Sequence, residues 1–129
     1  PELWEKMLAV ERDTAHFDKM TMMIAINYGG RDEIVHAAKQ VAKLAKDGQL
    51  DPDTLTEEQF AQYLYTAGVP DVDLLIRPSG ELRLSNYMIW QCAYAEFYFT
   101  NVLWPDFSPK ELDKALIDFA GRGRRFGGV

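Results

Sequence analysis

The chain has 129 residues, of which 47% are hydrophobic and 26% are charged. These proportions are typical of a globular protein, and the length suits one domain that buries a substantial core. The net charge of -6 argues against a general nucleic-acid-binding protein, and no apolar run reaches the roughly 20 residues that a membrane helix needs. Cys92 is the single cysteine, which excludes an internal disulfide. With no signal peptide recognised, we expect a soluble protein of the reducing cytoplasm.

Helices and strands are expected to alternate along the chain. In order, the predicted elements are helix 2–17, strand 19–27, helix 31–47, helix 56–66, strand 73–77, helix 85–92, strand 96–100 and helix 109–120. The strand 19–27 is apolar on both faces, as a buried parallel strand is. Thr56 and Ser108 each precede a Gln or Glu by three residues, which is the spacing of a capping box.

Strands that are separated by helices favour an α/β fold with a parallel sheet. Three strands are fewer than the five or six of an average sheet. The sequence therefore predicts a parallel sheet flanked by helices that forms half of a larger, doubly wound domain.

A polar loop follows the predicted strand 73–77, at the edge where open parallel sheets bind ligands. Arg77 and Arg83 lie six residues apart across a turn that contains Gly80, so both guanidinium groups can converge on one anion. Ser85, at a predicted helix start, adds a hydroxyl beside free N–H groups. This pattern suits a diphosphate. An arginine-rich surface turn is the alternative, and the spacing alone leaves both open.

The run from Asp73 to Asn86 resembles the signature of the cis-prenyltransferases, the undecaprenyl and decaprenyl diphosphate synthase group. Other segments resemble the family at the family's own spacing, so the resemblance extends over essentially the whole chain. These segments are Asn27 to Asp32, Trp90 to Glu96, Trp104 to Phe107 and Arg124 to Gly128. The resemblance implies that residues 1–129 are the C-terminal part of a single catalytic domain.

The resemblance also implies an activity. The family condenses isopentenyl diphosphate with an allylic diphosphate to give a long Z-polyprenyl diphosphate, the membrane-borne lipid carrier for cell-wall synthesis. It uses Mg²⁺ and usually acts as a homodimer.

By resemblance, Arg77, Arg83 and Ser85 bind the isopentenyl diphosphate group, and Glu81 in the same loop assists. Glu96 helps to hold magnesium, with an ordinary strand-edge carboxylate as the alternative. Gly127 lies in a tail whose backbone N–H reaches the partner's diphosphate, unless that tail is simply a frayed terminus.

Two departures from the family pattern matter. The family's Asp-Gly-Asn-x-Arg loop, which carries the aspartate central to magnesium binding, does not occur in this sequence, and Pro78 stands where many relatives have threonine. We therefore expect the catalytic aspartate to lie outside the chain and the chain alone to be inactive. A non-catalytic partner subunit of a heteromeric cis-prenyltransferase is an alternative. A generic nucleotide-binding half-domain is a weaker one, because no phosphate-binding glycine motif is present.

Overall fold

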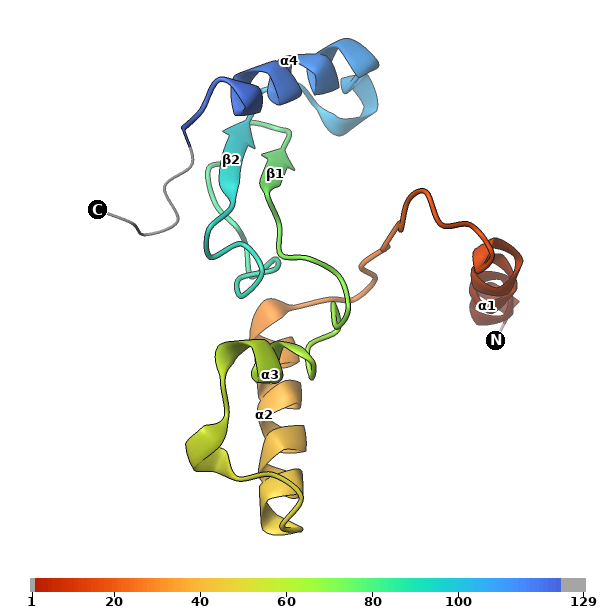
Figure 1. Ribbon diagram of the computed structural model, residues 1–129. Coiled ribbons are helices and arrows are strands. Elements are labelled where there is room, and N and C mark those ends of the chain that lie inside the picture. Colours follow the sequence, from red (N-terminus) through yellow and green to blue (C-terminus); the bar gives the residue numbers. More distant parts are fainter. Residues whose placement is uncertain (1, 124–129) are drawn as a thin grey trace.

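The computed structural model describes residues 2–123. Its helices are α1 (Glu2–Thr14), α2 (Gly30–Lys46), α3 (Glu57–Ala61) and α4 (Pro109–Ala120), its strands are β1 (Leu74–Arg77) and β2 (Glu96–Phe99), and its 3-10 turns are η1 (Pro52–Thr54) and η2 (Trp104–Asp106). Helices α2 and α3 lie side by side, α4 lies against the strands, and α1 stands apart at the end of an extended segment (Figure 1).

The two strands form a parallel sheet, in which Leu74 pairs with Glu96 and Arg77 with Phe99. This arrangement confirms the α/β fold with a parallel sheet. The carboxyl ends of both strands therefore lie at one edge, where the loop after Arg77 begins.

The strand predicted at residues 19–27 is wrong. This segment is irregular and fully exposed, with Met20, Met22 and Ile24 at 79%, 70% and 68% exposure. A strand forms only where a neighbouring backbone pairs its N–H and C=O groups. In the described part of the chain the sheet consists of β1 and β2, and neither pairs with this segment. The sheet therefore has two strands where three were expected.

The helix predicted at residues 85–92 is also wrong, because the segment folds as a series of turns. Ser85, Asn86 and Met88 have φ angles of 50°, 64° and 45°. Right-handed helices exclude such angles.

The remaining helices are confirmed with small corrections. The Gln59 N–H donates to Thr56 Oγ1 at 3.2 Å and the Thr56 N–H to Gln59 Oε1 at 3.0 Å, so the first capping box forms. Helix α3 ends earlier than expected, at Ala61, and turns follow it. The capping box at Ser108 is wrong, since its side chain makes no cap, although α4 begins with proline as predicted.

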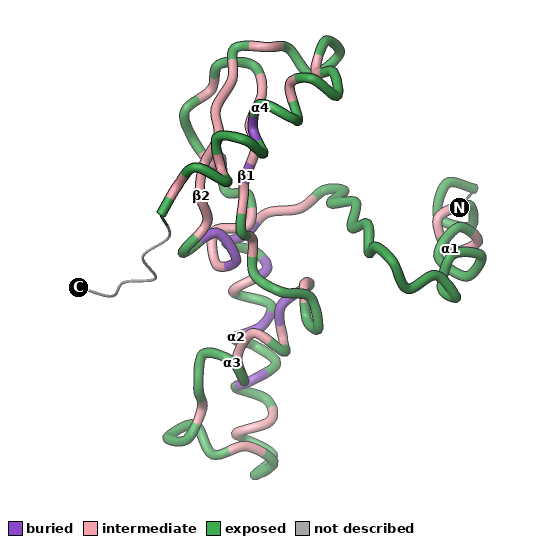
Figure 2. Tube along the Cα trace, turned by 45° about the horizontal axis from the view of Figure 1, so that its top comes forward, coloured by how far each residue is buried: buried purple, intermediate pink, exposed green. Residues whose placement is uncertain are grey.

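Little of the chain is buried. Its accessible surface is 10398 Å², whereas a compact monomer of this length has about 7000 Å². The expectation of a substantial core is therefore wrong. The buried apolar residues are Ala37, Val41, Leu64, Leu75, Cys92 and Ala115. Most of the buried segments gather where α2, α3 and the start of the strands meet (Figure 2).

Between residues 2 and 123, no helix has both the length and the hydropathy that crossing a bilayer requires.

Candidate functional site

The loop after β1, residues 77–86, gathers the predicted anion ligands and is called the arginine loop below. Arg77 Nη1 donates to the backbone carbonyl of Arg83 and, at 3.2 Å, to Ser85 Oγ. The Arg83 guanidinium donates to the Glu81 carboxylate. Arg83 and Ser85 are exposed, and Arg77 is half-buried. The structure thus brings Arg77, Ser85 and the Arg83 backbone together, and it pairs the Arg83 side chain with Glu81.

The turn at the start of the arginine loop packs on the segment that follows β2. The Ser79 N–H donates to the Val102 carbonyl and the Gly80 N–H to the Thr100 carbonyl, both at 2.8 Å. Gly80 has φ +71°, and a Cβ there would lie 2.8 Å from Asn101 Oδ1. Only glycine meets both conditions without strain. This turn therefore fixes the direction in which the loop leaves the sheet.

The predicted contribution of a helix start at Ser85 needs correction, because the described structure has no helix there. The neighbouring helix start belongs to α2, and Asn86 caps it. The Gly30 N–H donates to the Asn86 carbonyl at 2.7 Å, and the Arg31 N–H donates to Asn86 Oδ1 at 2.8 Å. These N–H groups are occupied, so an anion in the arginine loop would depend on guanidinium and hydroxyl groups.

Glu96 lies at the opposite end of the sheet from Arg77. It begins β2, three residues before the partner of Arg77, which corresponds to about 10 Å along the strand. Its carboxylate accepts from Arg122 Nη1 at 2.8 Å, and Arg122 also donates to the Phe97 carbonyl at 3.0 Å and to Asp118. Hydrogen bonds to Glu96 and Asp118 raise the pKa of Arg122. Glu96 is therefore one arm of an ion-pair cluster.

Magnesium requires several oxygen ligands, and Glu96 supplies one carboxylate. In the part of the chain that the structure describes, no three carboxylate, histidine or cysteine side chains group closely enough to hold a metal ion. Glu96 fits as a single ligand of a site that other residues would complete. Gly127, the predicted tail contact, lies outside the described residues.

Comparison with known proteins decides the family. The family model described as "Putative undecaprenyl diphosphate synthase" matches residues 1–127. The chain belongs to this cis-prenyltransferase family. The resemblance that the motifs carry is thereby confirmed.

Individual cis-prenyltransferases agree with the family match. The isoprenyl transferase of Heliobacterium mobile is 57% identical over 116 residues, which are 90% of this chain and 45% of that protein. The isoprenyl transferase of Bacillus subtilis is 53% identical over 118 residues, which are 92% of this chain and 45% of that protein. The structure of lavandulyl diphosphate synthase from Lavandula x intermedia, in complex with dimethylallyl diphosphate, has a TM-score of 0.94 and 42% identity, over 98% of this chain and 55% of that one. The chain spans about half the length of the curated relatives it matches.

The structure also contains a buried polar group, centred on Glu33 and Gln91, to which the sequence pattern assigned no role. Glu33 is fully buried and Gln91 is 2% exposed. The Glu33 carboxylate accepts hydrogen bonds from the Tyr28 hydroxyl, from the Tyr65 N–H at 2.8 Å, and from Gln91 Nε2 at 3.0 and 3.1 Å. Burial, with the hydrogen bond to Glu33, raises the pKa of Tyr28 well above its ordinary value.

The helical pattern held a clue to Glu33. The buried stripe of α2 consists of Gly30, Glu33, Ala37 and Val41, whereas the apolar Val35 is 50% exposed. Glu33 stands one turn before Ala37 on this stripe. A carboxylate on the buried face of a helix requires partners. The hydrophobic pattern alone could not identify them. Tyr28 precedes the helix, and Tyr65 and Gln91 lie 32 and 58 residues further along the chain.

The family segment Asn27 to Asp32 also has a structural explanation. A Cβ on Gly29 would lie 2.8 Å from Asn86 Nδ2, and one on Gly30 would lie 2.8 Å from Ile89 Cγ1 and 3.2 Å from the Asn86 carbonyl oxygen. Both glycines therefore allow α2 to approach the segment that follows the arginine loop.

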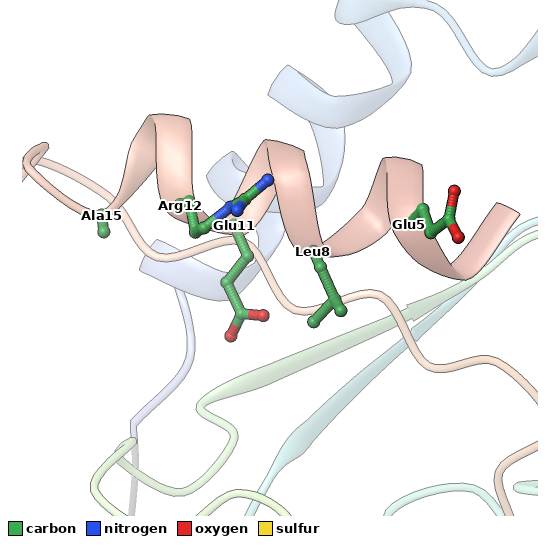
Figure 3. A pocket seen from close by; sticks show the side chains of 5 residues that line it. All are labelled: Glu5, Leu8, Glu11, Arg12 and Ala15. Atoms are coloured by element: carbon green, nitrogen blue, oxygen red, sulfur yellow. The ribbon is translucent and has the colours of Figure 1, made fainter. Parts of the chain in front are cut away.

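A separate hollow of about 440 Å³ lies along α1. Figure 3 shows its lining side chains, which all come from α1 or the residue directly after it. These residues are Glu5, Leu8, Glu11, Arg12 and Ala15. Two carboxylates against one guanidinium would repel a diphosphate, so this hollow is a poor candidate for the anion site.

Proposed function

We propose that the chain supplies the isopentenyl diphosphate site of a cis-prenyltransferase that condenses isopentenyl diphosphate with an allylic diphosphate. The product is a long Z-polyprenyl diphosphate that partitions into the membrane as the lipid carrier for cell-wall synthesis. The observation that carries this proposal is the contact of the Arg77 guanidinium with Ser85 Oγ and the Arg83 carbonyl at the carboxyl end of the parallel strands. The Arg83 guanidinium lies in the same loop, on Glu81. The names of the relatives, which are isoprenyl transferases, support it.

In this proposal, the two guanidinium groups exchange their present partners for diphosphate oxygens. Arg77 would release Ser85 Oγ, and Arg83 would release Glu81. Planar guanidinium groups suit phosphate oxygens because they donate two parallel hydrogen bonds. Each hydrogen bond to a charged group contributes about 1.5–3 kcal/mol, so the loss of one arginine should weaken binding about tenfold to a hundredfold.

The bound diphosphate orients the nucleophile. The isopentenyl double bond attacks the allylic carbon, a C–C bond forms, the allylic C–O bond breaks, diphosphate departs, and the isopentenyl unit loses a proton. The described residues contribute chiefly the proximity and orientation of the isopentenyl unit. The aspartate central to the family's chemistry is proposed to lie in a part of the domain outside residues 1–129.

Mg²⁺, when bound, would stabilise the charge of the diphosphate groups. Glu96 is proposed as one of its ligands, after exchange of its ion pair with Arg122. The backbone N–H of Gly127 is proposed to reach the partner's diphosphate in a homodimer, and the cytoplasm is the proposed compartment.

Calorimetric titration of this chain with isopentenyl diphosphate tests the proposal. We expect saturable binding, which Arg77→Ala and Arg83→Ala each weaken at least about tenfold. Lysine at either position should restore little, because the planar fork is lost. Arg12→Ala is the matched control, since Arg12 lies on α1 and should leave binding unchanged. In the complete enzyme, the same two variants should raise KM for isopentenyl diphosphate.

Two results would count against the proposal. Absence of saturable binding by the unaltered chain would contradict the proposal. It would favour the alternative of a non-catalytic partner subunit, even though this chain keeps the arginine-loop ligands that such subunits typically lose. Tighter binding of ATP than of isopentenyl diphosphate would favour a nucleotide-binding half-domain.

A further inference from the structure

The segment from Asn86 to Gln91 is attached at both ends to the first turn of α2. At its start, Asn86 binds the Gly30 and Arg31 N–H groups. At its end, Gln91 binds the Glu33 carboxylate. We propose that Glu33 and Gln91 form a positioning pair that holds the arginine loop in its binding geometry. The proposal rests on the function proposed above, and it assigns a role to two residues that make no hydrogen bond to Arg77, Arg83 or Ser85.

The geometry of the pair is unusually demanding. Gln91 Nε2 donates to both oxygens of Glu33 and lies 3.0 Å from Thr66 Oγ1, while Gln91 Oε1 is buried without a hydrogen-bond partner among the described residues. Turning the amide over would aim its oxygen at the carboxylate, and the two would repel. The fold therefore tolerates one unpaired buried oxygen and keeps the N–H groups on Glu33.

A buried polar pair of this kind is a weak source of stability compared with apolar side chains of similar size. Ala37 and Val41, which follow Glu33 along the same stripe, are such apolar residues. An apolar residue at position 33 would continue that stripe without orienting any neighbour. The carboxylate instead selects one position for Gln91, because its hydrogen bonds are directional.

Two routes connect the pair to the proposed site. The Gln91 carbonyl accepts from the Val72 N–H at 3.0 Å, just before β1, the strand that ends at Arg77. Asn86 directly follows Ser85, whose hydroxyl accepts from Arg77. Glu33 thus acts through Gln91 on the start of β1, and through the segment from Asn86 to Gln91 on the end of the arginine loop. Neither member of the pair contacts Arg77 or Ser85 itself, so both are positioning residues.

A charge exchange within the pair tests the proposal. The proteins are this chain unaltered, Gln91→Glu, and the double variant Glu33→Gln with Gln91→Glu. Their affinities for isopentenyl diphosphate are measured by calorimetry, with circular dichroism to check the fold.

Gln91→Glu places two carboxylates about 3 Å apart, which is strongly unfavourable. We expect affinity to fall at least about tenfold. The double variant restores an acid–amide pair, and we expect affinity within about threefold of the unaltered chain. Gln40→Glu, an exposed change of the same kind on α2, is the matched control and should have no effect.

The outcomes separate this inference from the function on which it rests. If the unaltered chain binds and Gln91→Glu binds equally well, the positioning role is overturned and the proposed function stands. If the folded double variant does not recover affinity, the pairing is likewise overturned. If Gln91→Glu fails to fold, recovery of the fold in the double variant supports the pair, and its failure to fold contradicts it. If the unaltered chain does not bind, the proposed function falls. The positioning role is then tested by NMR. The Ser85 and Arg77 amide resonances should shift in Gln91→Glu and return to their original positions in the double variant. Unchanged resonances in Gln91→Glu would overturn the positioning role.

Discussion

Residues 77–91 and residues 15–27 are both irregular, yet the chain holds only the first segment in place by its own hydrogen bonds. In the first segment, Ser79, Gly80, Asn86 and Gln91 bind backbone or side-chain groups far away in the sequence. In the second, no residue from 18 to 27 has a backbone hydrogen bond within the described part of the chain. The two segments differ in their hydrogen-bond partners. Both carry backbone N–H and C=O groups, but only residues 77–91 find donors and acceptors for them elsewhere in the chain.

The comparison shows what an apolar pattern can and cannot specify. Residues 19–27 have the composition of a buried strand, but a strand also needs a neighbour at hydrogen-bonding distance. The arginine loop has no regular pattern, and it is nevertheless specified by glycines and by buried polar side chains. The chain spans about half the length of its relatives. The segment that does not form its predicted strand is the apolar one, residues 19–27, which needs a neighbouring strand to pair with.

The largest expected effect is on stability, and it contrasts an apolar residue of β1, the strand that leads into residues 77–91, with one in residues 15–27. Leu75 is 8% exposed in β1, whereas Ile24 is 68% exposed. Leu75→Ala should lower the free energy of unfolding by about 2–5 kcal/mol, and Ile24→Ala should change it by less than about 0.5 kcal/mol. Urea denaturation followed by circular dichroism measures both. A large loss in Ile24→Ala would show that residues 15–27 are packed in solution, and the contrast between the two segments would break.

A second prediction concerns the close approach of α2 to the segment after the arginine loop. A Cβ on Gly30 meets Ile89 Cγ1 at 2.8 Å and backbone atoms at 3.2 Å, so Gly30→Ala should cost about 1–3 kcal/mol of unfolding free energy. Gly123→Ala is the control, since no heavy atom lies within 4 Å of its added Cβ. Equal denaturation midpoints for the two variants would mean that this contact does not restrain the segment.

Much of the fold could be predicted because local rules decided it. The cap at Thr56 and the proline at position 109 set the starts of helices without reference to the rest of the molecule. The strands β1 and β2 pair with each other, so their prediction was confirmed. The errors at 19–27 and 85–92 have different causes: the first strand has no neighbour to pair with, and the second segment contains residues with positive φ angles.

Only the proposed diphosphate ligands of the candidate site could be predicted from the sequence. Arg77, Arg83 and Ser85 stand close in sequence, and the edge of a parallel sheet indicated where they would lie. The buried pair of Glu33 and Gln91 could not be found in this way, since its members are 58 residues apart. Glu33 was recognisable as a charge on a buried helical stripe, but identifying its partner required the tertiary structure.

A smaller effect is expected at Asn86, which caps α2 from a distance and has φ +64°. Asn86→Ala removes the acceptor for the Arg31 N–H and places alanine in the left-handed region, so we expect a loss of about 1–2 kcal/mol. Asn86→Gly removes the acceptor without the backbone strain and should cost less. The difference between the two denaturation midpoints separates the cap from the strain. Identical midpoints for both variants and the unaltered chain would show that α2 does not need this cap.

The smallest expected effect concerns Cys92, which directly follows Gln91 and is 4% exposed. Burial, and then the charge of Asp71, raises the pKa of its thiol. Only the thiolate is alkylated readily, so iodoacetamide at pH 8 should modify the folded chain at least about tenfold more slowly than the chain in urea. Because the folded pKa is the higher one, the neutral thiol stabilises the fold below the ordinary cysteine pKa, and this stabilisation is lost as the pH rises through the raised value. The denaturation midpoint should therefore fall slightly at alkaline pH, and Cys92→Ala should flatten that dependence. Rapid alkylation of the folded chain would mean that the segment around Gln91 opens often. Residues 77–91 would then be only somewhat better held in place than residues 15–27.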